Sequence, residues 1–128
     1  MSRIIHFEIP TNDPAASIKF YETVLGWKFE KYPGPMDYWL ISTGDRNLPG
    51  IDGGLSGAAD DFKTTVNTAE VDNLDETFKL VQANGGQVIT AKNLIPGVGW
   101  IAYIRDPGGT VLGLLEPLPG RPVRPTQE

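Results

Sequence analysis

The sequence predicts an α+β fold in which two tandem βαβββ modules form one curved mixed sheet around a concave pocket. Alternating apolar segments and two amphipathic helical segments occur in the order strand, helix and three strands, and this order occurs twice. A constant offset places equivalent features of the two halves on each other, Asp13 on Asn73 and Gly26 on Gly86. The 15 glycines and 11 prolines among 128 residues indicate many tight turns between short elements.

The length of the chain bounds its domain organisation. A chain of 128 residues is the size of one domain with a substantial core. We expect a single domain over residues 1–118, with modules at about residues 2–57 and 61–117, and a flexible proline-rich tail over residues 119–128. Neither module alone closes a sheet, so both are expected to pack around a shared concavity where a small ligand binds.

The composition narrows the class of partner. Hydrophobic residues make up 40% of the chain and charged residues 21%, which is normal for a soluble globular protein. No apolar run is long enough to span a membrane, and no basic-then-apolar secretory leader is visible. The net charge of −5, without a cluster of Lys and Arg, argues against nucleic acid as a partner. The absence of cysteine excludes disulfides and thiolate sites and is compatible with the cytoplasm, where we expect the protein.

The first predicted strand carries the only histidine of the chain. Its alternating pattern places two polar residues, His6 and Glu8, on one face and apolar residues on the other. The apolar residues are Ile5, Phe7 and Ile9. The pattern predicts a half-buried strand with His6 on its polar face.

The rest of the first module follows from local signals. Asp13 before Pro14 predicts the start of a helix, and Gly26 predicts its end. Three strands are then expected, over residues 27–32, 36–42 and 48–56. Glycines in the last of these strands indicate close backbone approach or space for a ligand.

The second module repeats this order. A strand is expected over residues 62–71, followed by a helix that begins after Asn73 and ends before Gly85. Three more strands are expected, over residues 87–94, 100–105 and 110–116.

The order of elements, the early IIHFEI strand, the helix that ends in FYETVLGW and the late DPGGTVLGLLE segment together resemble the vicinal oxygen chelate superfamily. This superfamily includes glyoxalase I, extradiol dioxygenases, fosfomycin-resistance enzymes and bleomycin-resistance proteins. The resemblance covers residues 2–117 and implies the glyoxalase/bleomycin-resistance/dihydroxybiphenyl dioxygenase-like fold. It does not specify a reaction, because this fold hosts several.

The resemblance also implies where metal ligands would lie. Metal-dependent members place His, Glu or Gln on the first and fourth strands of each half. The matching positions here are His6, Val66, Gly53 and Gly113, of which only His6 has a donor side chain. A catalytic divalent site normally needs three protein ligands. We therefore expect no cofactor, with a divalent metal as the less favoured alternative.

Two nearby carboxylates are not expected to complete such a site. Side chains alternate between the faces of a strand with a period of two residues. Asp52 is adjacent to Gly53, and Glu116 lies three residues beyond Gly113, so both carboxylates are expected on the opposite face.

The candidate catalytic residues are His6 and Glu8. An imidazole changes charge near neutral pH, so His6 can serve as an acid, a base or a hydrogen-bonding group in the pocket. Glu8 can orient His6 or act as a general base. The alternatives are that His6 is a structural remnant of a lost metal site and that Glu8 is an ordinary strand carboxylate.

The remaining candidates line the expected pocket. The third strands carry the aromatic side chains Tyr38, Trp39, Trp100 and Tyr103, some of which would line the cavity and stack on a flat or apolar ligand. The alternative for each is a place in the core or an interface. Trp39, Trp100 and Tyr103 are the ones expected in the pocket. Gly53 and Gly113 remove side-chain volume where metal-dependent relatives carry ligands, and Val66 replaces another ligand.

Together these features predict a glyoxalase/bleomycin-resistance-like protein that binds a small organic molecule in a pocket without the complete family metal site. The alternative is a lyase, isomerase or dioxygenase of the same superfamily that uses His6 and Glu8, with or without metal. A third hypothesis is an interaction domain without small-molecule chemistry. We also expect a homodimer and no membrane partner.

Overall fold

A computed structural model describes residues 1–59 and 62–119, so most of the expected tail over residues 119–128 lies outside the described residues. The chain divides into two compact units. The N-terminal unit is His6–Val66, and the C-terminal unit combines Met1–Ile5 with the chain from Asn67 onward. Neither described helix has the length and apolar character needed to cross a membrane.

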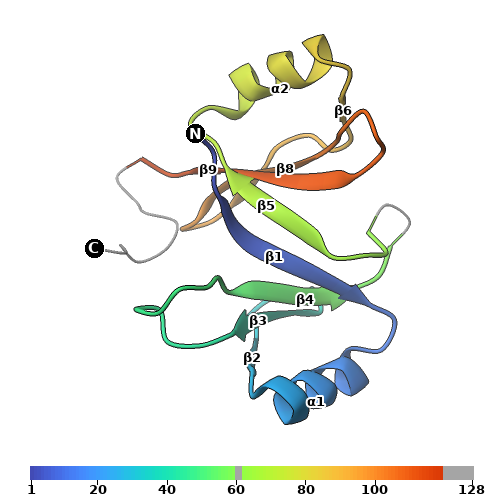
Figure 1. Ribbon diagram of the computed structural model, residues 1–128, viewed down its shortest axis with the longest axis vertical. Helices are drawn as coiled ribbons and strands as arrows, with labels where there is room; N and C mark the ends of the chain where they lie inside the picture. Colours follow the sequence, from blue (N-terminus) through green and yellow to red (C-terminus); the bar gives the residue numbers. More distant parts are fainter. Residues whose placement is uncertain (60–61, 120–128) are drawn as a thin grey trace. The chain divides into compact units, whose positions relative to one another are not determined.

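The N-terminal unit contains one βαβββ module (Figure 1). Its strands follow the order β2-β3-β4-β1, in which β1 and β4 are parallel and the other neighbours are antiparallel. The first two residues of β1 belong to the C-terminal unit. The elements are β1 (Ile4–Thr11), α1 (Pro14–Leu25), β2 (Lys28–Lys31), β3 (Tyr38–Ser42) and β4 (Gly53–Gly57).

Local signals set the ends of α1 as predicted. The side chain of Asp13 accepts a hydrogen bond from the backbone N–H of Ala16 at 3.1 Å, which caps the N-terminus. Gly26 adopts a left-handed φ of 71° at the C-terminus, a conformation that glycine tolerates best.

An aromatic cluster joins α1 to one face of the N-terminal sheet. The Trp27 ring lies 5.7 Å from Phe7 of β1 and stacks at 5.1 Å on Tyr21 of α1. Ile41 of β3 and Leu55 of β4 are buried. This face of the sheet is the helix-covered face of the unit, and it contains the odd-numbered residues of β1.

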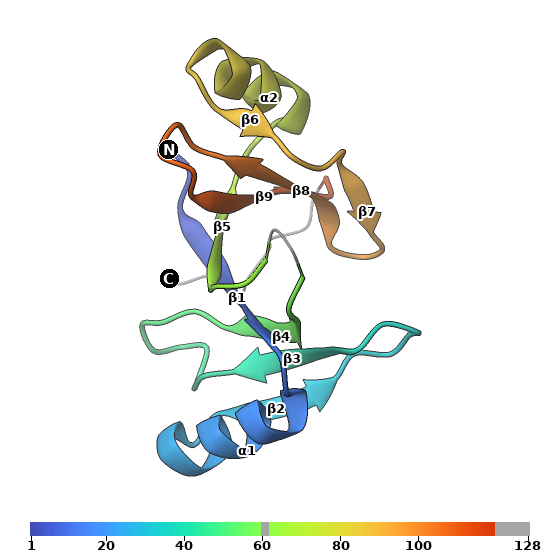
Figure 2. The same ribbon diagram turned by 90° about the vertical axis from the view of Figure 1, so that its right-hand side faces the viewer.

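The C-terminal unit contains the second module (Figure 2). Strand β5 is parallel to β9, β9 is antiparallel to β8, and both β6 and β7 pair with β8. The elements are β5 (Val66–Glu70), α2 (Leu74–Ala83), β6 (Gln87–Val88), β7 (Asn93–Ile95), β8 (Gly99–Arg105) and β9 (Val111–Pro117). The first residue of β5, Val66, belongs to the N-terminal unit.

The strand predicted over residues 87–94 is wrong, because two short strands, β6 and β7, occupy this segment. The backbone N–H groups of Ile89 and Thr90 both donate to the carbonyl oxygen of Tyr103, at 3.0 and 3.3 Å. Two consecutive residues that share one partner interrupt the regular ladder, as a bulge does.

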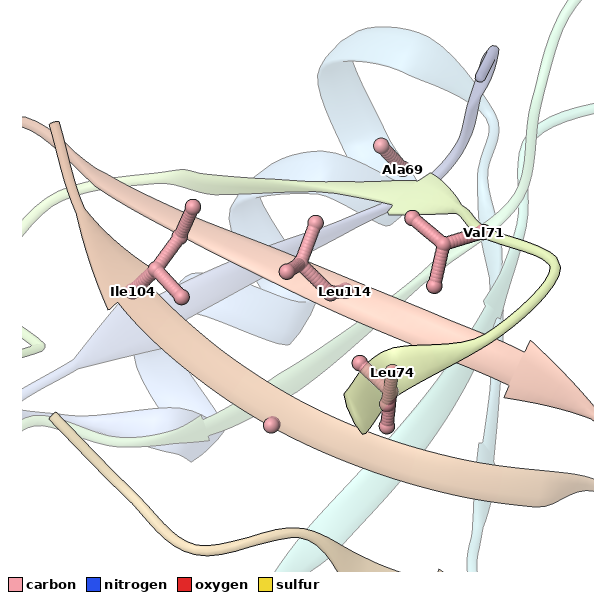
Figure 3. Close-up of a cluster of buried hydrophobic side chains, with 6 residues drawn as sticks. Ala69, Val71, Leu74, Ile104 and Leu114 are labelled. Atoms are coloured by element: carbon pink, nitrogen blue, oxygen red, sulfur yellow. The ribbon is translucent and has the colours of Figure 1, made fainter. Parts of the chain in front are cut away.

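The core of the C-terminal unit lies between α2 and its sheet. Figure 3 shows Ala69, Val71, Leu74, Ile104 and Leu114 converging in this cluster. Glu116 lies on the same side, since its Oε1 accepts a hydrogen bond from the backbone N–H of Leu74 at 2.7 Å. This strand-end carboxylate therefore caps α2 on the face opposite Gly113, as the alternation of side chains predicts.

Replacement of Thr68 on β5 by valine is expected to stabilise the protein. The residue is 1% exposed, and its hydroxyl has no hydrogen-bond partner among the described residues. An unpaired buried hydroxyl costs on the order of 1 kcal/mol or more, whereas valine keeps nearly the same shape. We expect Thr68→Val to raise the free energy of unfolding by about 1 kcal/mol in urea titrations, and Thr68→Ala to lower it. A loss of stability in Thr68→Val would show that the hydroxyl has a partner.

Candidate functional site

The pairing of β1 with β4 defines the polar face that carries His6. Glu8 lies beside Gly54, and Phe7 lies beside Gly53. Because side chains alternate, position 54 shares a face with His6 and Glu8, which we call the His6 face. A Cβ atom at Gly53 would instead lie 2.5 Å from the Phe7 carbonyl oxygen and 2.7 Å from its ring. The expected place of Gly53 beside His6 is therefore taken by Gly54.

Tyr38 of β3 fills the space above Gly54. A Cβ atom at position 54 would overlap the hydroxyl group of Tyr38. The same hydroxyl lies 3.2 Å from Nε2 of His6, within hydrogen-bond distance. The Tyr32 ring packs edge-to-face against Tyr38, with centroids 6.1 Å apart at 88°. These contacts bring His6 and Tyr38 together as the His6–Tyr38 pair.

The environment keeps both members of this pair neutral near pH 7. Burial lowers the pKa of His6 from its usual 6.5, and the negative charge of Asp52 opposes this change. Burial raises the pKa of Tyr38 above its usual 10, and Glu8 and Tyr32 act in the same direction. The pair is therefore a neutral imidazole bonded to a neutral phenol, and either group can be the donor, depending on the imidazole tautomer.

Asp52 lies on the His6 face, contrary to the expectation that its separation from Gly53 excludes it from that face. It is two residues from Gly54, which is the position that shares the His6 face, and its charge acts on His6. Its carboxylate accepts hydrogen bonds from the backbone N–H of Thr43 at 2.9 Å and from the Thr43 hydroxyl at 3.2 Å. The Nε atom of Arg46 lies 3.7 Å from Oδ2 of Asp52. These contacts hold Asp52 at the start of β4.

The lowered pKa of His6 predicts a loss of stability in mild acid. The unfolded chain takes up a proton near pH 6.5, whereas the folded chain does so only at lower pH. The stabilisation is complete above about pH 6.5 and is lost as the pH falls towards the folded-state pKa, by at most about 1.4 kcal/mol per pH unit. In urea titrations from pH 7.5 to 5, His6→Gln should lack this part of the pH dependence. An identical pH dependence in both proteins would contradict the prediction.

The two predicted tryptophans lie on helix-covered faces. Trp39 pairs with Leu55 and precedes Ile41 by two residues, so it shares the face of these buried side chains. Trp100 packs against the core cluster of the C-terminal unit. Trp39 therefore does not share a face with the His6–Tyr38 pair, and Trp100 does not share a face with Tyr103.

Two of the other predicted pocket residues, Tyr103 and Gly113, lie on one face of the C-terminal sheet. Tyr103 and Thr68 both lie beside Gly113. A Cβ atom at Gly113 would lie 2.5 Å from the Thr68 hydroxyl oxygen and 3.2 Å from the Tyr103 ring. Val66, two residues before Thr68, is buried. Gly113 thus provides room for Thr68, the position that corresponds in register to Glu8.

The donor residues do not fit the metal set that the resemblance implies. Within residues 1–59 and 62–119, no three His, Cys, Asp or Glu side chains are grouped so that they could hold a metal ion. On the His6 face, position 54 has no side chain, and the Tyr38 hydroxyl occupies the space it would need. What this face offers a ligand is hydrogen bonding by the imidazole of His6 and the phenol of Tyr38.

Comparison with known sequences finds two kinds of similar protein. A family model for the bleomycin resistance protein-like N-terminal region matches residues 3–44. CFP32 of Mycobacterium bovis and of Mycobacterium tuberculosis, a protein named as a glyoxylase, is 29% identical over 119 residues. The match covers 91% of this chain and 44% of CFP32, so the chain spans less than half the length of these curated relatives.

Solved structures share the fold over nearly the whole chain. Methylmalonyl-CoA epimerase from Mycobacterium tuberculosis has a TM-score of 0.67 at 18% identity, covering 91% of this chain and 88% of the epimerase. A protein of the glyoxalase/bleomycin resistance protein/dioxygenase superfamily from Vibrio splendidus 12B01 has a TM-score of 0.63 at 15% identity, covering 92% and 100%.

Proposed function

We propose that this chain is a member of the vicinal oxygen chelate superfamily and that it binds a small organic molecule on the His6 face without the complete family metal site. The observation that carries the proposal is the 3.2 Å contact between His6 Nε2 and the Tyr38 hydroxyl above Gly54. It supplies a neutral, half-buried hydrogen-bonding pair on the face where the resemblance implies metal ligands. A few well-placed polar groups of this kind can fix the orientation of a small ligand.

The chemistry of the pair favours a ligand with a carbonyl or hydroxyl oxygen. A phenol with a raised pKa stays protonated at physiological pH and remains a hydrogen-bond donor. A neutral imidazole offers one donor and one acceptor nitrogen. A solved protein of the same fold is named for methylmalonyl-CoA, which is itself a carbonyl compound.

A second candidate function is enzymatic. An imidazole in contact with a phenol, with Glu8 on the same strand face, can accept a proton from a substrate and return it. If a substrate is turned over, this arrangement supports the proton-transfer chemistry of a lyase or isomerase. A dioxygenase reaction has no such support in the contacts of His6.

The proposal is tested by screening small carbonyl compounds, among them 2-oxo acids, aldehydes and thioesters, for a ligand that raises the melting temperature. We expect His6→Gln and Tyr38→Phe to weaken binding of that ligand at least tenfold. Tyr21→Phe is the matched control, because Tyr21 lies in the aromatic cluster on the helix-covered face. A ligand that binds all four proteins equally would contradict the proposed site.

The same titrations distinguish binding from catalysis. If the ligand is consumed, the rate should fall in His6→Gln and in Glu8→Gln, and the enzymatic candidate is supported. If the ligand is recovered unchanged, the protein sequesters it. An unchanged rate in both variants would remove His6 and Glu8 from the mechanism.

We also propose that the protein is a cytoplasmic homodimer. The cysteine-free sequence supports a reducing compartment. Apolar side chains of α1 support self-association, since Phe20, Val24 and Leu25 are 56%, 58% and 52% exposed. Sedimentation equilibrium is expected to give the dimer mass at micromolar concentration. A monomer at all concentrations would contradict it.

A further inference from the structure

Gly54 and Tyr38 form one structural feature of the His6 face. A Cβ atom at position 54 would overlap both the hydroxyl group and the ring of Tyr38. The Tyr38 ring is held in this place by the edge-to-face contact with Tyr32. A side chain at position 54 and Tyr38 in its present position therefore exclude each other.

The Tyr38 hydroxyl also contacts Nε2 of His6, one of the two ring nitrogens through which a histidine can bind a metal. A histidine ligates a metal through the lone pair of one ring nitrogen, and Nε2 of His6 lies 3.2 Å from the Tyr38 oxygen. Asp52 is engaged by both polar groups of Thr43. Nε2 of His6 and Oδ1 of Asp52 thus already take part in other hydrogen bonds.

We infer that Tyr38 excludes divalent metal ions from the His6 face, because it engages Nε2 of His6 and fills the place from which a β4 side chain would reach the same ion. This inference deepens the proposed function, since it explains why the ligand on this face is recognised by hydrogen bonds. It assigns Tyr38 as the residue that determines which class of ligand binds.

The inference predicts that two substitutions create a metal site. Removing the Tyr38 side chain frees Nε2, and a glutamate at position 54 projects from the β4 residue that pairs with Glu8. His6, Glu8 and the new carboxylate at position 54 would then lie on one face of the sheet. Three such donors suffice for a divalent transition metal.

The experiment uses the full chain, freed of metal with EDTA and titrated with Co²⁺ by calorimetry and visible absorption. We expect Tyr38→Ala/Gly54→Glu to bind one Co²⁺ at least tenfold more tightly than the unmodified protein. Adding His6→Gln to the double variant should abolish the gain. The matched control is Tyr38→Ala/Gly57→Glu, which adds the same charge at an exposed glycine with open space around it in the described structure.

Two results would overturn the inference. One is a double variant that is folded by circular dichroism and binds Co²⁺ no better than the control. The other is an unmodified protein that binds Co²⁺ through His6 as tightly as the double variant.

A milder variant keeps the inference testable if the double variant does not fold. Tyr38→Phe retains the ring that packs on Tyr32 and removes only the hydroxyl. We expect the Cε1–H resonance of His6 to shift in this variant, and an unchanged resonance and titration would show that the hydroxyl does not hold the imidazole. These readouts need no organic ligand, so a failed ligand screen would count against the proposed function alone.

Discussion

Gly54→Ala is expected to separate Tyr38 from His6 and to lower the free energy of unfolding by about 1–3 kcal/mol. The new methyl group would occupy the position of the Tyr38 hydroxyl. Tyr38 must then leave its contacts with both His6 and Tyr32, or the strands must move apart. Urea unfolding gives the stability, and the Cε1–H resonance of His6 reports the lost contact.

The control for this substitution is Gly57→Ala on the same strand. A Cβ atom at Gly57 meets nothing within 4 Å in the described structure, so little change is expected. If Gly54→Ala were as stable as Gly57→Ala and left the His6 resonance in place, the close approach of Tyr38 to Gly54 would be refuted.

Leu74→Ala is expected to lower the free energy of unfolding by about 2–5 kcal/mol, a larger loss than Gly54→Ala. Leu74 is 0% exposed and begins α2 inside the core cluster of the C-terminal unit (Figure 3). Truncation would leave a cavity between α2 and strands β8 and β9. The hydrogen bond from its backbone N–H to Glu116 is untouched, so the loss reports packing alone.

Leu80→Ala is the matched control, because Leu80 lies on the same helix and is 64% exposed. Its substitution is expected to change the free energy of unfolding by no more than about 0.5 kcal/mol. Equal losses in the two variants, measured by urea unfolding, would contradict the placement of the core on the Leu74 side of α2.

Features that depend on residues close together in the chain could be predicted from the sequence. The caps Asp13, Asn73 and Gly26 act within one helical turn. The predicted order of elements is confirmed in the first module and, apart from the division of one strand into β6 and β7, in the second. The division between β6 and β7 could not be predicted, because it depends on how Ile89 and Thr90 bond to a strand that begins ten residues later in the chain.

The candidate site could be predicted in part for the same reason. The alternation along β1 placed His6 and Glu8 on one face, but the residue of β4 beside Glu8 depends on strand register. In the N-terminal unit Glu8 pairs with Gly54, and in the C-terminal unit its counterpart Thr68 pairs with Gly113. The offset between equivalent positions of the two modules is therefore one residue shorter in the last strand than in the first. For this reason the constant offset pointed to Gly53 instead of Gly54, and it placed Asp52 on the opposite face.

Tyr38 shows a further limit of the sequence. It could be placed on the third strand, yet its contact with His6 joins residues 32 positions apart and depends on Gly54 lying between them. The signal that could have found it is the combination of a tyrosine on β3 with a glycine on the neighbouring strand. Neither residue alone points to the other.

The most direct test of the His6–Tyr38 pair uses the fact that His6 is the only histidine. Long-range ¹H–¹⁵N correlation spectra of the uniformly labelled protein at pH 7 give the protonation and tautomer of its imidazole without ambiguity. We predict a neutral ring with a pKa below 6.5 and ¹⁵N shifts that one equivalent of Zn²⁺ leaves unchanged. A ring protonated at pH 7, or an Nε2 resonance that moves to a metal-bound position with one equivalent of Zn²⁺, would contradict the account.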